Sequence, residues 1–334
     1  MKLVTFGLKG SKERQPMVGV ILDEDIILNL QPAAALYLKE LEKEKDPYLL
    51  AGQLIPADMV GFLRHGKSAM NLARRTIKAI AKWQKTEKKG LKGLRREPLF
   101  FPSSRVVLKA PVPRPGKIIA MGLNFRDHAA ENKVPIPEIT VGFLKASSSV
   151  IGPYDPVPYP QSTSQLDYEI ELSIVIGKKG KDISKEKAFD YVAGYTIMND
   201  LSTRDIQAKE MEKKLILLAK SLDAFGPMGP YLVTQDEIAD PHNLGMELWV
   251  NKESEPRQRS STNQLIFKIP DLIAYWSKMT LEPGDVITSG TPGGVAIFRQ
   301  PDPERWLLKP GDVVEAKIES LGFIRNTIVT DFPV

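Results

Sequence analysis

The chain has 334 residues, of which 42% are hydrophobic and 26% are charged, values typical of a globular protein with about two domains and a sizeable core. It contains no cysteine, which excludes disulfides, zinc–thiolate sites, iron–sulfur clusters and a cysteine nucleophile. The net charge is +5, and the sequence shows neither an apolar run of about 18 residues nor the pattern of a secretory leader, so we expect a cytoplasmic protein without a membrane span.

Residues 1–110 are predicted to form a small, β-rich N-terminal domain. Residues 1–30 alternate short apolar runs with charged turns, which is typical of β-strands. From Gly66 apolar residues recur at helical spacing, and Gly90 is expected to end this helix. Five prolines between residues 98 and 115 indicate an extended connector, because proline fixes φ and removes a backbone donor. We therefore place the start of a second domain at residue 111.

The helix of the N-terminal domain belongs to a strongly basic segment. Residues 74–96 carry ten basic side chains and one acid, Glu87, which gives this segment a charge of +9 and the rest of the chain −4. Basic helices can bind nucleic acid, so a nucleic-acid-binding protein is kept as a hypothesis of another class. No nucleic-acid motif accompanies the segment, and we favour a solvated helix face.

Residues 111–334 are predicted to form a larger, β-rich domain. Apolar runs of the strand type dominate it, and helices are expected at about residues 128–132, 184–191, 204–219 and 262–278. Strands outnumber helices and do not alternate regularly with them, which argues against a doubly wound parallel sheet. The predicted fold class is therefore α+β and β-rich.

Two glutamates open the best strand of this domain. Side chains alternate faces along a strand, so Glu169 and Glu171 in the run DYEIEL point the same way, with Cα atoms about 7 Å apart. Two carboxylates on one face repel each other unless a positive charge lies between them, and a hard divalent cation such as Mg²⁺ prefers such oxygen ligands. The alternative is a solvent-facing strand with ion-paired glutamates.

Asp200 is a candidate third carboxylate. It ends the apolar run YTIMN and begins a polar helical stretch, in which Arg204 and Gln207 share a face. A carboxylate at a strand end can complete a three-carboxylate site. The simpler alternatives are an N-cap for the following helix and a surface ion pair between Asp200 and Arg204.

His128 and Glu131 form a possible His–Glu pair. At positions i and i+3 of one helical turn, the carboxylate can orient the imidazole, and a histidine held in this way can act as a general base on water. Taken alone, the pair is more often part of a surface helix.

Residues 281–294, LEPGDVITSGTPGG, combine a turn, a strand and a glycine-rich loop. Glycine lets a backbone approach a ligand closely, whereas the lysine and the spacing of a phosphate-binding P-loop are missing. A tight hairpin connection is the alternative.

Together these segments resemble the fumarylacetoacetate hydrolase family over about residues 115–330. The resemblance rests on several motifs in the same order, among them MGLNFRDHAAEN, DYEIELSIVIG, VAGYTIMNDLSTRDIQ and LEPGDVITSGTPGGV. It implies a mixed β-sandwich roll, preceded by the small β-rich domain of the longer members, and usually a homodimer. It also implies Mg²⁺ in the site, with Mn²⁺ as an alternative and Ca²⁺ as a substitute in crystals.

The resemblance assigns roles to individual residues. The metal carboxylates of the family match Glu169, Glu171 and Asp200, and its catalytic dyad matches His128 and Glu131 in a segment that acts as a lid. The residues that stabilise an oxyanion match Arg204, Gln207 and Lys220. Positions near the substrate carboxylate and the metal match Lys145 and Thr291.

Two departures from the family pattern concern the substrate. Asn124 stands where hydrolases of the tyrosine pathway have a fourth carboxylate, which indicates the three-carboxylate type, and Phe125 replaces the commoner tyrosine near the lid. Both changes leave the predicted metal site intact.

These parts support two enzymatic hypotheses for a small 2-oxo or β-diketo acid. We favour hydrolysis, in which the dyad activates water to attack an acylpyruvate and a C–C bond breaks through an enolate stabilised by the metal. If no water is admitted, the same site would move a proton instead, as an oxaloacetate tautomerase or a decarboxylase.

Overall fold

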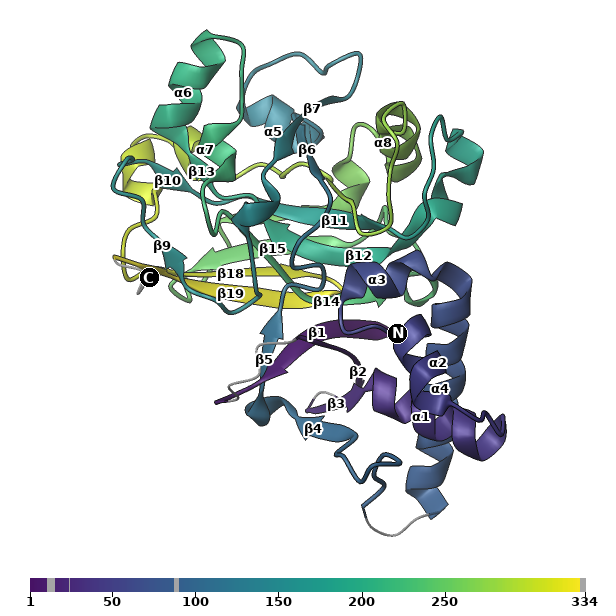
Figure 1. The fold of residues 1–334 in the computed structure, drawn as a ribbon. Coiled ribbons are helices and arrows are strands. Elements are labelled where there is room, and N and C mark those ends of the chain that lie inside the picture. Colours follow the sequence, from purple (N-terminus) through teal and green to yellow (C-terminus); the bar gives the residue numbers. More distant parts are fainter. Residues whose placement is uncertain (11–15, 24, 87–89, 331–334) are drawn as a thin grey trace.

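The structure is a computed structural model that describes residues 1–10, 16–23, 25–86 and 90–330. The N-terminal elements lie in the lower half of Figure 1 and the remaining elements above them. The elements of the N-terminal part are β1 (Lys2–Leu8), β2 (Met17–Asp23), β3 (Ile26–Asn29), α1 (Leu30–Leu41), α2 (Pro47–Leu54), α3 (Met59–Arg64), α4 (Gly66–Thr86), β4 (Phe100–Pro102) and β5 (Val106–Lys109).

The larger part follows from residue 118. Its strands are β6 (Ile118–Gly122), β7 (Val141–Lys145), β8 (Val150–Ile151), β9 (Val157–Pro158), β10 (Leu166–Asp167), β11 (Ile170–Ile176), β12 (Val192–Asn199), β13 (Ser202–Thr203), β14 (Gly226–Thr234), β15 (Gly245–Val250), β16 (Gln258–Ser261), β17 (Val286–Thr288), β18 (Val313–Ile318) and β19 (Gly322–Val329). Its α-helices are α5 (Arg126–Glu131), α6 (Arg204–Glu212), α7 (Leu218–Ser221) and α8 (Ile269–Trp276). Short 3₁₀ helices lie at Ser103–Arg105, Ser147–Ser149, Lys185–Tyr191, Gln235–Glu237, Thr262–Gln264, Ala296–Phe298 and Pro303–Trp306.

The strands predicted for residues 1–30 are present, and four helices accompany them. Helix α4 was predicted, whereas α1, α2 and α3 were not. Buried alanines and leucines on α1 pack with α4 into one core, so the N-terminal part has more helical than strand residues. None of the described helices combines the length and the apolar character that a membrane span needs.

The described basic side chains of α4 lie on its exposed face. Arg74 pairs with Asp236 at 3.2 Å and Arg75 with Glu42 at 2.7 Å, while Lys88 and Lys89 lie outside the described residues. The opposite face, with Leu72, Ala73 and Ile80, is buried. This arrangement supports the interpretation of α4 as a solvated, amphipathic helix.

One mixed sheet joins both parts of the chain. Its strand order is β4-β3-β2-β1-β14-β12-β11-β17-β6-β7, and β1 pairs with β14 through Lys2 opposite Val233 and Leu3 opposite Leu232. The two parts therefore share backbone hydrogen bonds, and the domain boundary at residues 110 and 111 stays a prediction.

A second sheet, β16-β15-β18-β19-β9, packs against the centre of the first. Every residue of β11 is buried. Ile170, Leu172 and Ile174 face the core between the sheets, whereas Val175, on the other face of β11, packs with the core that extends into the N-terminal part. The structure thus has the predicted α+β, β-rich class, as a two-sheet sandwich.

The single helix predicted for residues 204–219 is wrong, because the chain breaks between α6 and α7. Lys214 has a positive φ of 59°, and the Glu210 carboxylate accepts hydrogen bonds from the backbone N–H groups of Leu217 and Leu218 at the start of α7. In a continuous helix Arg204 and Lys220 would lie about 24 Å apart. Because of the break, Lys220 contacts Glu169, the carboxylate that Arg204 also contacts.

Candidate metal centre and active site

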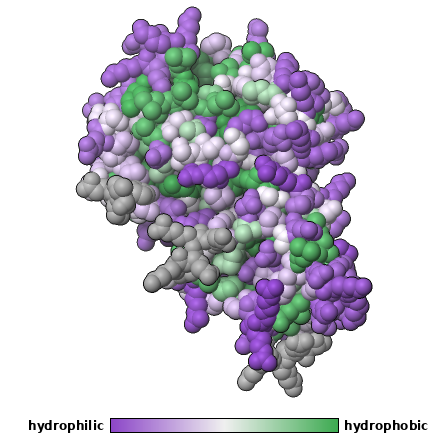
Figure 2. Space-filling view, viewed as in Figure 1, coloured by the Kyte–Doolittle hydropathy of each residue, from purple (hydrophilic) through white to green (hydrophobic). Residues whose placement is uncertain are grey.

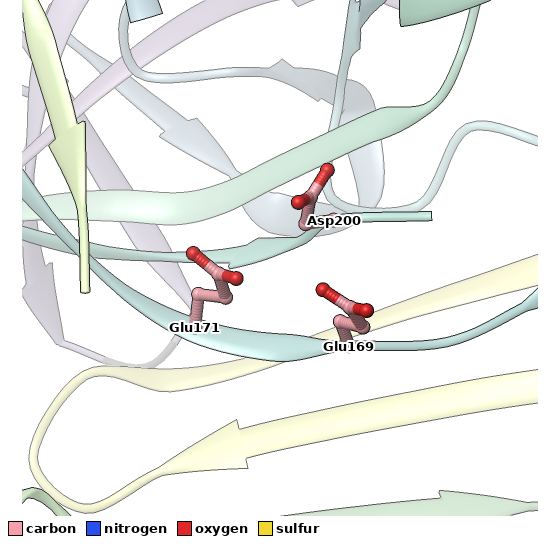
Figure 3. A group of neighbouring side chains, drawn as sticks. All are labelled: Glu169, Glu171 and Asp200. Carbon is pink, nitrogen blue, oxygen red and sulfur yellow. The ribbon is translucent and has the colours of Figure 1, made fainter. Parts of the chain in front are cut away.

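Three carboxylates converge at one end of the β11–β12 pair. Glu169 lies just before β11, Glu171 lies in it, and Asp200 directly follows β12. The Asp200 N–H donates to the Glu169 carbonyl at 2.8 Å, which fixes the two strand ends side by side. Figure 3 shows the three side chains pointing toward a common space. One oxygen of each carboxylate lies within 4.8 Å of the others, and all three residues are buried.

The simpler interpretations of these acids do not agree with the structure. The glutamates do not face solvent, since Glu169 is 6% and Glu171 is 0% exposed. Asp200 does not cap the following helix, because the N-cap of α6 is Thr203. Arg204 forms its ion pairs with Asp167 and Glu169 instead of a surface pair with Asp200.

Buried cations surround the carboxylates. The Lys220 ammonium contacts Glu169 Oε2 at 2.7 Å and Asp200 Oδ2 at 3.0 Å, and Lys145 Nζ lies 2.9 Å from Asp200 Oδ1. The Arg204 guanidinium bridges Asp167 Oδ2 and Glu169 Oε1, each at 2.7 Å. Glu169 and Asp200 are thus paired with cations through both of their oxygens.

Glu171 differs from its two neighbours in its electrostatics. Burial raises its pKa well above the ordinary range, and the negative charges of Asp200 and Glu169 raise it further. For Glu169 burial also acts to raise the pKa, but Lys220 and Arg204 outweigh it and the pKa is lowered. The negative charge of Glu171 therefore lacks a cationic partner of its own, which a bound metal ion would provide.

The residues present fit a hard divalent cation. Glu171 Oε1 is buried and has no hydrogen-bond partner. The donor set is all oxygen, and ligand oxygens around an octahedral Mg²⁺ lie roughly 3–4 Å apart, which is compatible with carboxylate oxygens that lie within 4.8 Å of one another. Asp167, Glu169, Glu171 and Asp200 also outnumber the cations Lys145, Arg204 and Lys220 by one charge.

The His–Glu pair is formed, and it is not on the surface. His128 Nδ1 lies 2.7 Å from Glu131 Oε1, and His128 is 8% exposed. His128 lies close enough to Glu169 to contribute to the lowered pKa of that carboxyl, so the pair and the carboxylates belong to one site. Because Nδ1 faces Glu131, Nε2 is the ring nitrogen available to a substrate.

Backbone contacts hold the helix that carries this pair, α5. The N–H of Gly294 donates to Glu131 Oε2 at 2.7 Å, and that of Gly293 donates to Asp127 Oδ1 at 3.3 Å. Ser260 Oγ donates to the other oxygen of Asp127. The glycine-rich loop thus holds α5 in place, and the lid role of this segment stays a prediction.

Gln207 and Thr291 lie at the edge of the carboxylate cluster. Gln207 Oε1 accepts from Arg204 at 2.8 Å, and Thr291 Oγ1 accepts from Gln258 Nε2 at 2.9 Å. The residue before Thr291, Gly290, has φ of +83° and donates its N–H to Glu171 Oε2 at 3.1 Å. Substrate contacts of Gln207 and Thr291 stay predictions.

The sequence analysis missed two residues that organise the site. Asp167 binds Arg204 and also accepts the N–H of Ala296 at 2.9 Å. The alternation Asp167, Glu169, Glu171 is a signal that would have found it. Gln258 accepts the N–H of Ile170 at 3.0 Å and donates to Thr291, across 88 and 33 residues, and no sequence pattern indicates these contacts.

The Asn124 side chain is hydrogen-bonded to backbone groups and is not free to bind a metal. Its amide donates to the carbonyls of Ser289 at 2.8 Å and Phe267 at 3.2 Å, and its oxygen accepts the Phe267 N–H at 2.8 Å. Phe125 is fully buried in the core. Both departures from the family pattern therefore have structural roles here.

We expect Asn124→Asp to destabilise the protein without strengthening metal binding. The change removes two buried donor bonds, which costs about 1–3 kcal/mol of unfolding free energy. Urea unfolding and calorimetric titration with Mg²⁺ measure the two quantities. A tighter Mg²⁺ complex in the variant would show that position 124 is a ligand position.

Comparisons with known proteins agree with this geometry. The family model described as fumarylacetoacetate (FAA) hydrolase C-terminal matches residues 117–329. The protein named oxaloacetate tautomerase Fahd2a, mitochondrial, of Rattus norvegicus is 44% identical over 276 residues, which cover 82% of this chain and 80% of that protein. The name of that protein places it in mitochondria, which differs from the cytoplasmic location expected above for this chain.

Two solved structures cover nearly the whole chain. The fumarylacetoacetate hydrolase from psychrophilic Exiguobacterium antarcticum has a TM-score of 0.73 at 30% identity and covers 99% of this chain and 100% of its own. Maleylpyruvate hydrolase from Sphingobium sp. SYK-6 has a TM-score of 0.69 at 29% identity and covers 98% of this chain and 99% of its own.

Proposed function

Because the chain belongs to the fumarylacetoacetate hydrolase family, we propose that it is a divalent-metal-dependent tautomerase of oxaloacetate. The observation that carries this proposal is the buried Glu169–Glu171–Asp200 cluster beside the His128–Glu131 pair, in a chain 44% identical to a protein named as such a tautomerase. The C–C hydrolysis favoured from the sequence has less support than this alternative.

Glu169, Glu171 and Asp200 would hold a divalent cation, which would supply positive charge for a dicarboxylate and Lewis-acid stabilisation of negative charge on its keto oxygen. Lys220 adds buried positive charge on the same side, whereas burial lowers the pKa of Lys145, which contacts Asp200. Burial acts to lower the pKa of Lys220, but Asp200 and Glu169 outweigh it and raise that pKa, so Lys220 stays an ammonium ion. Arg204 holds Glu169 in place.

Enol-to-keto conversion removes the proton of the enol hydroxyl and adds one at C3. His128 Nε2 is the atom that takes and returns this proton, and Glu131 stabilises the imidazolium formed in between through Nδ1. The hydrogen bonds between α5 and the glycine-rich loop hold the buried His128 in position for this transfer.

The test is a direct assay on enol oxaloacetate, followed by the loss of its ultraviolet absorbance. We expect the protein with Mg²⁺ to accelerate this loss beyond Mg²⁺ alone, and EDTA to abolish the acceleration. An acylpyruvate is assayed in parallel, and pyruvate release is measured with both substrates.

The outcomes separate the candidate functions. Pyruvate release from the acylpyruvate, without acceleration of the enol reaction, would replace the proposal by hydrolysis, the activity named for the maleylpyruvate hydrolase. Pyruvate release from oxaloacetate would identify a decarboxylase. Equal rates with and without EDTA would contradict the metal dependence.

The homodimer implied by the family resemblance is a further proposal. It is supported by apolar side chains that are more than half exposed near α6 and α7, where Figure 2 shows green surface at the upper left: Met211, Leu215, Leu217 and Leu218. Such contiguous apolar surface is typical of an interface. Sedimentation equilibrium should give twice the chain mass of 37.2 kDa, and a monomer at micromolar concentration would contradict it.

A further inference from the structure

Two buried hydroxyls lie behind Glu171 and have no role in the site as described so far. Ser173 follows Glu171 by two residues on β11, and Thr288 on β17 is directly opposite Ser173. Side chains at such positions share one face of a sheet. Ser173, Thr288 and Glu171 therefore project from the same face of the large sheet, and all three are 0% exposed. We call Ser173 and Thr288 the hydroxyl pair.

Four polar atoms in this region lack hydrogen-bond partners: Glu171 Oε1, Ser173 Oγ, Thr288 Oγ1 and Asp200 Oδ1. Asp200 Oδ1 has an ionic partner in Lys145 at 2.9 Å, which leaves the first three. The Thr288 hydroxyl nevertheless lies close enough to Glu171 to favour its ionised form and lower its pKa. Thr196, on the other side of Ser173, differs because its hydroxyl donates to the Gly229 carbonyl at 3.1 Å.

Such a group of unpaired atoms destabilises the folded state unless the atoms share a hydrogen-bonding partner. A buried polar atom without a partner costs roughly 1–3 kcal/mol. Opposite residues in a sheet have Cβ atoms roughly 5 Å apart, so the two hydroxyls can bind the same small polar group. Internal waters make about three hydrogen bonds to otherwise unsatisfied groups, which equals the number of atoms here that have neither a hydrogen bond nor an ionic partner.

We propose that the hydroxyl pair, through one enclosed water molecule, holds Glu171 Oε1 and so orients this carboxylate for the metal. The inference rests on the proposed function, because it assumes that Glu171 is a metal ligand. Ser173 and Thr288 act as positioning residues, since neither touches substrate. Loss of such partners typically weakens metal binding by about 10–100-fold.

The experiment measures Mg²⁺ affinity by calorimetry, without substrate, in the double variant Ser173→Ala/Thr288→Val. We expect its Kd to rise about 10–100-fold. Thr288→Ser keeps a hydroxyl and is expected to bind Mg²⁺ nearly as the unmodified protein does. Thr76→Val is the matched control, because Thr76 Oγ1 is also buried and unpaired but lies on α4, outside the site.

A double variant that is folded by near-ultraviolet circular dichroism and binds Mg²⁺ with unchanged Kd would overturn the inference. An equal loss of Mg²⁺ affinity in Thr76→Val would also overturn the inference, because the effect would then come from a general destabilisation of the fold. If the double variant does not fold, the Mg²⁺ Kd is measured for Ser173→Ala and Thr288→Val separately, and an unchanged Kd in both would overturn the inference. If the unmodified protein binds no divalent cation, the metal dependence of the proposed function fails, and this inference fails with it.

Discussion

Replacing Glu171 by glutamine should abolish Mg²⁺ binding and lower kcat/KM for enol oxaloacetate by roughly 10²–10⁴-fold, because the Lewis acid contributes several kcal/mol. Glutamine keeps the shape of the side chain and can still accept the Gly290 N–H through its oxygen. The substitution therefore removes the charge with little change in packing. Calorimetric titration with Mg²⁺ and the ultraviolet assay measure the two effects.

The same variant should be more stable than the unmodified protein when no metal is present. Burial and the charges of Asp200 and Glu169 raise the pKa of Glu171, so its ionised form is unfavourable in the folded state. The control is Glu304→Gln, a change of an exposed glutamate, which should alter neither Mg²⁺ affinity nor rate. Normal Mg²⁺ affinity in Glu171→Gln would remove Glu171 from the metal site.

His128→Gln should lower kcat by about 10²–10⁴-fold and leave the Mg²⁺ affinity nearly unchanged. General acid–base catalysis contributes a factor of this size, and glutamine cannot take up a proton. His128 contacts Glu131 and not a metal carboxylate, so its loss leaves the donor set intact. Stopped-flow absorbance gives the rate, and calorimetry gives the affinity.

Two further variants test whether the loss of kcat in His128→Gln is specific to the His128–Glu131 pair. Glu131→Gln should cause a smaller loss of rate and shift the pH profile, because Glu131 acts through His128. His65→Gln, which changes an exposed histidine, should have no effect. Full activity of His128→Gln would show that another group moves the proton.

The relation between sequence and structure differs from residue to residue in the site. The alternation of Glu169 and Glu171 at the start of β11 and the placement of Asp200 after β12 follow from local spacing, and the structure brings all three together. The His128–Glu131 contact is similarly local, at one helical turn. Lys220 is different, because its position depends on the break between α6 and α7, which helical periodicity does not show.

The choice between chemistries also depended on more than spacing. The three carboxylates and the dyad are compatible with both hydrolysis and proton transfer. The relatives named as tautomerases support proton transfer, and backbone contacts of Gly293 and Gly294 hold the helix that carries the dyad. Those backbone contacts join residues more than 160 positions apart, at a distance where no sequence pattern indicates a partner.

By itself the sequence determined the β-rich class and the local pairs Glu169–Glu171 and His128–Glu131, because strand and helix periodicity fix which neighbouring side chains share a face. The family, and with it Asp200 as the third metal acid, followed from the resemblance of several motifs in the same order. Only the tertiary structure decided that Asp167 and Arg204 hold Glu169, that Gln258 ties the glycine-rich loop to β11, and that Lys220 returns to the carboxylates. The physical reason is that these contacts join segments brought together by packing of the whole sheet, whose energy no local stretch of residues contains.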